Sequence, residues 1–114
     1  MDDQATVADL RAAVHQFVSE REWQPFHSPK NLSGAIAIEA AELMEIFQWL
    51  TNEQSLQAAG EASIRQRTRE ELADVVIYCL ALANILDIDL SQAVLEKMTR
   101  NAAKYPVASS RGRL

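Results

Sequence analysis

The segment 75–86, VVIYCLALANIL, is the feature that most constrains the fold of this chain. If this segment is helical, apolar side chains occupy nearly its whole circumference, and such a helix has to be covered on several sides. A chain of 114 residues offers few other helices to cover it. We therefore predict a homodimer or homotetramer in which this helix lies near the interface. The alternative is a central helix that is covered within one subunit.

The rest of the chain also favours helices. Three Gly and three Pro leave little turn chemistry, which argues for long helices over many short strands. Hydrophobic spacing predicts helices over 7–21, 31–50, 64–86 and from Asp89 or Ser91 to 104. The polar stretch 51–63 is expected to be a connecting or mobile loop, and 107–114 a flexible tail. We predict a single domain, 1–114, with an all-α fold, a four-helix and mainly antiparallel bundle completed by oligomerisation.

The predicted helix starts rest on capping residues. Thr6 can cap the first helix, and Asn31 is a natural N-cap for the second. The third helix has two candidate starts. In TREE, Thr68 and Glu71 could form a capping box, whereas a start at Ser63 would leave Glu71 in the middle of the helix.

Charge and cysteine content limit the function classes. A formal net charge of −5 argues against nucleic-acid binding through a basic patch. Cys79 is the only cysteine, so an intrachain disulfide is excluded, and its simplest role is that of a small buried hydrophobe. The acidic start MDDQATVADL has no apolar signal core, and the longest apolar run is far below the ~20 residues of a membrane helix. We predict a cytoplasmic protein without membrane contact.

Two carboxylate pairs interrupt the apolar pattern. EAAE places Glu39 and Glu42 three residues apart, and ELAD does the same for Glu71 and Asp74. Helical positions three apart project to one side, so four carboxylates converge if the two helices pack antiparallel. Like charges in a partly dry place repel strongly unless a cation neutralises them. Oxygen ligands of this kind suit Mg²⁺.

These glutamates could also belong to an ordinary solvated helix face. A single E-x-x-E spacing arises by chance in many helical proteins, and the series continued by Glu45 could be a stripe that pairs with Lys or Arg. Asp74 argues for a site, because Asp is a poor residue for a helix interior and here precedes nine apolar positions. A di-iron carboxylate bundle is excluded, since neither His15 nor His27 follows a glutamate at the required spacing.

With both pairs placed, the chain resembles the MazG-like all-alpha nucleoside triphosphate pyrophosphohydrolases. Their hallmark is E-x-x-E followed, after a variable linker, by E-x-x-D, which EAAE and ELAD match. The chain is most similar to the dCTP pyrophosphatase branch. The segments that carry this resemblance are REWQPFHSPKNL, EAAELMEIFQW, EELADVVIYCLALA and KMTRNAAKYP.

The resemblance implies Mg²⁺-dependent hydrolysis of a (deoxy)nucleoside triphosphate, with dCTP or a modified dCTP as candidate, to the monophosphate and pyrophosphate. It assigns the metal to Glu39, Glu42, Glu71 and Asp74, and Glu42 could also orient or deprotonate the attacking water. Trp23 and Trp49 offer stacking surfaces for a base, although bulky aromatics are more often core. The other implied substrate contacts are His27, Lys30, Tyr78, Lys97, Asn101 and Tyr105.

One departure leaves the base preference open. The dCTP branch has a histidine at the place that aligns with Val14, whereas this chain has His15 next to it. A phosphoribosyl-ATP or dUTP hydrolase within the same superfamily is an alternative. A non-catalytic helical oligomer that only binds nucleotide or partner helices is a further one. Independently of that choice, Lys97 and Asn101 could belong to a solvated polar face.

Overall fold

The computed structural model describes residues 1–113, and the secondary structure in this range is entirely helical. This confirms the predicted all-α class. No helix in the described range is both long and apolar enough to cross a membrane. The elements are α1 (Val7–Glu20), the short 3₁₀ helix η1 (Gln24–Phe26), α2 (Pro29–Phe47), α3 (Asn52–Ala58), α4 (Ala62–Leu86), α5 (Leu90–Lys104) and α6 (Val107–Ser110).

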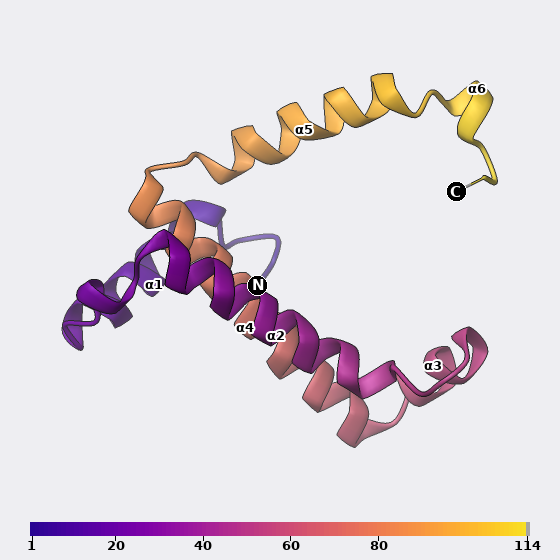
Figure 1. Cartoon of the computed structure of the whole chain (residues 1–114), viewed down its shortest axis with the longest axis horizontal. Coiled ribbons are helices and arrows are strands. Elements are labelled where there is room, and N and C mark those ends of the chain that lie inside the picture. Colours follow the sequence, from indigo (N-terminus) through magenta and orange to yellow (C-terminus); the bar gives the residue numbers. More distant parts are fainter. Residues whose placement is uncertain (114) are drawn as a thin grey trace.

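The fold is built around α4. The helices α2 and α4 lie side by side and run in opposite directions, and α1 packs on α4 (Figure 1). The side chains that this packing buries are few: Leu32, Ile46, Leu80, Ala81 and Ala83. From the end of α4 the chain turns, and α5 extends away from the other helices without a buried residue (Figure 1). Within one chain, only three of the four predicted long helices therefore pack together.

Two N-terminal caps differ in how well the sequence predicted them. Thr6 caps α1 as expected, since its Oγ1 accepts a hydrogen bond from the Asp9 backbone N–H at 3.1 Å. The predicted Asn31 cap of α2 is wrong. Ser28 is the N-cap, and its Oγ accepts from the Asn31 backbone N–H at 3.1 Å. Pro29 explains the earlier start, because its fixed φ suits the first helical position and it has no N–H to satisfy.

Neither of the two candidate residues caps α4, because its N-cap is Glu61, which makes no side-chain capping hydrogen bond. The helix begins at Ala62, one residue before Ser63. Thr68 lies within the helix and donates from Oγ1 to the Ile64 carbonyl at 2.7 Å, so it is not a cap. This start places Glu71 in the middle of α4, where its side chain can face α2.

The connecting segments contain more helix than predicted. The stretch 51–63 is not a simple loop, because Thr51 and Gln54 form a capping box that starts α3. Of the two candidate caps for α5, Asp89 is the one used; its Oδ1 accepts from the Gln92 N–H at 2.9 Å. The short α6 lies within the predicted tail, whose last residue, Leu114, is outside the described range.

Arg11 ties α1 to the C-terminal end of α4. Its guanidinium donates to the Asn84 Oδ1 at 3.0 Å, to the Ile88 carbonyl at 2.7 Å and to the Ala83 carbonyl at 3.3 Å. Asn84 returns a hydrogen bond from Nδ2 to the Arg11 carbonyl at 3.0 Å. The Ala83 carbonyl also accepts from the Ile88 backbone N–H at 3.0 Å. Arg11 therefore adds positive charge at the C-terminal end of α4, where the helix dipole favours a cation.

We expect Arg11→Leu to lower the free energy of unfolding by about 2 kcal/mol, because it removes three charge-assisted hydrogen bonds and leaves the Asn84 Oδ1 and the Ile88 carbonyl without this donor. Urea denaturation followed by circular dichroism measures this. Arg69→Leu is the matched control, since the Arg69 guanidinium bonds only Gln66 on an exposed face of α4. A change below about 0.5 kcal/mol for Arg11→Leu would contradict a structural role for the guanidinium.

Candidate functional site

Three glutamates meet at the packed face between α2 and α4. One carboxylate oxygen from each of Glu39, Glu42 and Glu71 lies within 4.8 Å of the others. Asp74 follows Glu71 by three residues, and its negative charge acts on both Glu39 and Glu71. Glu45, the third glutamate of the α2 series, is exposed. The antiparallel packing of α2 and α4 thus gathers the two motifs in one place.

Few hydrogen bonds and no ion pair within residues 1–113 compensate the negative charge of this cluster. Glu39 Oε2 and Glu71 Oε2 are buried and have no hydrogen-bond partner. The ion pairs within residues 1–113 join the N-terminus to Asp3 and Arg21 to Glu20, and none involves the cluster. A solvated stripe neutralised by Lys or Arg does not describe this arrangement. Buried oxygens that lack a proton donor are groups that a metal ion would satisfy.

The crowding changes how the glutamates titrate. A hydrogen bond with Glu42, burial and the surrounding negative charges raise the pKa of Glu39 to about 7. Burial, followed by the hydrogen bond and charge of Glu42, also raises the pKa of Glu71. Near neutral pH the cluster is therefore poised between holding a proton and holding a cation. Carboxylate oxygens alone are the donor set that hard divalent cations prefer, so the residues fit a metal ion.

A cavity of about 680 Å³ lies beside the carboxylates, mainly between α1 and α4. Its walls are largely apolar, which suits a site that binds an organic group and excludes water. The aromatic edge is built by Trp23, which meets Phe17 edge to face at 5.7 Å between ring centroids. The sequence-predicted site residues that line the cavity are Trp23, His27, Glu39, Asp74 and Tyr78.

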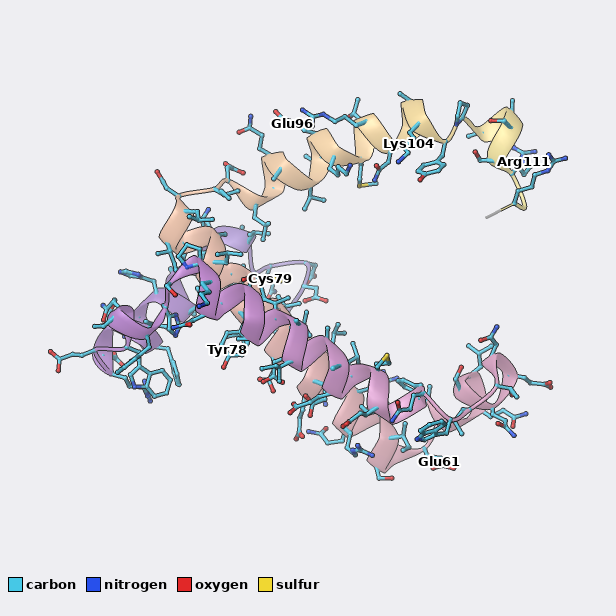
Figure 2. All side chains as sticks on the ribbon, in the orientation of Figure 1. Glu61, Tyr78, Cys79, Glu96, Lys104 and Arg111 are labelled. Carbon is cyan, nitrogen blue, oxygen red and sulfur yellow. The ribbon has the colours of Figure 1, made fainter. Side chains whose placement is uncertain are left out.

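The remaining sequence-predicted residues lie outside this cavity. Lys30 is exposed in the first turn of α2, and Trp49 follows the end of α2 with 86% of its surface accessible. Lys97, Asn101 and Tyr105 belong to α5 or its C-cap, in the part of the chain that extends away from α4. In Figure 2, Lys104 on α5 lies well apart from Tyr78 on α4.

A smaller cavity contains residues that the sequence did not point to. It has a volume of about 140 Å³ and shares Val14, Val18, His27 and Ala81 with the larger one. The polar residues Gln24 and Asn84 line it as well. Glutamine and asparagine carry no spacing signal of their own, and only the fold brings the η1 segment against the end of α4.

Comparison with known proteins supports this description. The family model described as MazG-like matches residues 35–113. The chain is 44% identical to dCTP pyrophosphatase 1 of Bos taurus over 107 residues, which is 94% of this chain and 63% of that protein. It is 41% identical to dCTP pyrophosphatase 1 of Homo sapiens over 106 residues, or 93% of this chain and 62% of that protein. The chain thus spans somewhat less than two thirds of these relatives.

A solved structure is similar along most of its own length. The crystal structure of a pyrophosphatase from Archaeoglobus fulgidus superposes with a TM-score of 0.81 at 38% sequence identity, covering 87% of this chain and 91% of that one. The family match begins just before Glu39 and continues through α4 and α5, so it includes both carboxylate motifs. This chain belongs to the MazG-like family.

Proposed function

We propose that this chain is a pyrophosphohydrolase that converts a nucleoside triphosphate, dCTP or a modified dCTP, into the monophosphate and pyrophosphate. The observation that carries the proposal is the cluster of unpartnered carboxylates at the edge of a cavity large enough for a nucleotide. The relatives named dCTP pyrophosphatase 1 and the archaeal pyrophosphatase support the same reaction. Such an enzyme would remove particular or modified triphosphates from the nucleotide pool.

Glu39, Glu42, Glu71 and Asp74 would hold Mg²⁺. The unpartnered oxygens of Glu39 and Glu71 and the mutual repulsion of the group favour a divalent cation there. When bound, Mg²⁺ supplies positive charge that neutralises both the carboxylates and the oxygens of the triphosphate. The protein's own task is then to fix the carboxylates, which it does by mounting two on each of two packed helices.

The chain's side chains can be given roles in the hydrolysis. Water attacks the α-phosphorus, the bond from that phosphorus to the bridging oxygen breaks, and pyrophosphate leaves. Glu42 is the candidate for orienting and deprotonating the water, because it is the exposed member of the cluster. Tyr78 lies one turn after Asp74 and can contact the phosphates or sugar. Trp23 lines the larger cavity and offers an indole face to the nucleotide.

We further propose that a second copy of the chain completes the site. The segment after Glu96 contains five basic residues and no acidic one, and removing their charge from the net −5 leaves −10 on residues 1–96. The helix that carries most of these charges extends away from the acidic body. The basic residues are Lys97, Arg100, Lys104, Arg111 and Arg113.

Exposed apolar side chains on α4 and α5 support the same contact between two copies of the chain. Leu95 and Met98 on α5 are 65% and 61% exposed, and Leu72 on α4 is 52% exposed. A homodimer or homotetramer that seats α5 of one copy on the acidic, apolar body of another would cover these side chains and pair the opposite charges. It would also carry Lys97, Asn101 and Tyr105 toward a triphosphate bound at the partner's carboxylates. Lys30 and Trp49 could enter the site in the same way.

The hydrolase assignment predicts pyrophosphate release with Mg²⁺ from a panel of nucleoside triphosphates, with dCTP as a preferred substrate. Asp74→Asn and Glu39→Gln should each lower kcat/KM by about 100-fold, the upper range for loss of a group that supports a metal site. Glu70→Gln is the control, because Glu70 is exposed and hydrogen-bonds Gln66. If no triphosphate is hydrolysed, the enzymatic proposal is wrong and a nucleotide-binding oligomer remains.

The raised pKa of Glu39 predicts a pH-dependent stability without metal. Its carboxyl group binds a proton more tightly in the folded state, with a pKa of about 7 against 4.5, so folding stability falls as pH rises through this window. Glu39→Gln should flatten that fall and raise Tm at neutral pH in EDTA. Added Mg²⁺ should raise the Tm of the unmodified protein. Thermal unfolding measured across the window tests this, and an equal pH dependence in Glu39→Gln and Glu70→Gln would contradict it.

The two-copy site predicts complementation between inactive variants. Asp74→Asn and Lys97→Ala damage the same site from different chains, so a mixed dimer contains one site with neither change. Equal mixing after reversible dissociation should restore about a quarter of full activity, since half of random dimers are mixed. Leu95→Asp should shift the protein toward monomer in analytical ultracentrifugation. If the mixed oligomer is no more active than the two variants measured separately, each site belongs to one chain and the two-copy proposal is wrong.

A further inference from the structure

The smaller cavity described above, hereafter the side chamber, has no role in the hydrolysis as proposed. It lies next to the larger cavity, because Val14, Val18, His27 and Ala81 line both. Its volume of about 140 Å³ is close to that of an engineered cavity of about 150 Å³ known to hold benzene. The side chamber therefore fits a single six-membered ring better than a fused purine.

The position of the side chamber suits one end of a nucleotide. Asp74 lines the larger cavity near the carboxylates, and Ala81 lies seven residues further along α4 at the wall shared with the side chamber. Seven residues of α-helix correspond to about 10 Å. A sugar and an α-phosphate bridge such a separation, so a nucleotide with its phosphates at the carboxylates would bring its base to the side chamber.

Two side-chain amides line the side chamber, and their hydrogen bonds distinguish them. Both polar atoms of the Asn84 amide already form hydrogen bonds with Arg11. Its Oδ1 accepts from the Arg11 guanidinium, and its Nδ2 donates to the Arg11 carbonyl. Gln24 donates from Nε2 to Ser19 Oγ at 3.2 Å, and this hydroxyl is also 3.4 Å from the His15 Nε2. With its NH₂ group held by Ser19, Gln24 keeps its carbonyl oxygen as an acceptor for a ligand.

We propose that Gln24 selects a cytosine ring in the side chamber by accepting a hydrogen bond from its exocyclic amino group. Uracil and thymine carry a carbonyl oxygen at this position, so two acceptors would face each other and one would stay unpaired. Ser19 is a positioning residue that orients the Gln24 amide. This inference rests on the proposed nucleotide substrate, and it assigns base choice to residues separate from the carboxylate cluster.

The test compares kcat/KM for dCTP and dUTP in the unmodified protein and its variants. The ratio should favour dCTP by about tenfold, the value of one well-placed hydrogen bond, and Gln24→Leu should bring it close to one. Gln24→Glu keeps an acceptor and should keep the preference. Ser19→Ala should lower the ratio without slowing dUTP hydrolysis, which a general loss of structure would not do. Gln16→Leu is the control, since Gln16 is exposed on α1 and hydrogen-bonds Glu20.

Binding of dCMP and dUMP, measured by calorimetry without Mg²⁺, separates this inference from the hydrolase proposal. Tighter binding of dCMP that is lost in Gln24→Leu would support the role of Gln24 even if no triphosphate were hydrolysed. Hydrolysis with an unchanged dCTP to dUTP ratio in Gln24→Leu would overturn the inference and leave the hydrolase proposal in place. Equal binding of the two monophosphates to the unmodified protein would also overturn it.

Discussion

Repulsion between carboxylates at the α2–α4 contact is the constraint around which this structure is arranged. Glu39, Glu42 and Glu71 bring oxygens within 4.8 Å of one another, and two of those side chains have a buried oxygen without a partner. Such an arrangement persists only if other contacts hold the two helices together. The buried side chains Leu32 and Ile46 on α2 and Leu80 on α4 provide that packing. Buried apolar residues before and after the two carboxylate motifs therefore hold the charges in place.

The same packing leaves the single chain with a small core. Five side chains form the buried apolar set within residues 1–113, while Leu72, Val76 and Ile77 on α4 stay partly exposed. Arg11 adds hydrogen bonds at one end of α4, but these are polar and bury little apolar surface. A helix that is apolar on most sides is thus covered on only two of them by its own chain. The exposed basic α5 offers a matching surface, which is why assembly and completion of the site are proposed together.

The sequence predicted those parts of the fold and site that depend on local spacing. Two E-x-x-[ED] pairs on neighbouring helices were enough to place Glu39 beside Glu71, because helix geometry and antiparallel packing convert spacing into proximity. Capping chemistry was less reliable. Asn31 and Ser28 are both good caps, and Pro29 decided between them. The side chamber could not be predicted, since Gln24 and Asn84 become neighbours only when η1 folds back against the end of α4.

Along α4, the residues proposed for the reaction are separate from the residues proposed for base preference. The carboxylates occupy the first half of α4 and the opposing part of α2, whereas the side chamber lies against residues 81–85 and the η1 segment. A rigid helix keeps these two regions at a constant separation, which a sugar phosphate can span. Substitutions around Val14, His15 and Gln24 can therefore change which ring fits without moving a carboxylate. As proposed, the reaction would depend on a motif with strict spacing, and the base preference would depend on a few side chains whose contacts arise only from the tertiary structure.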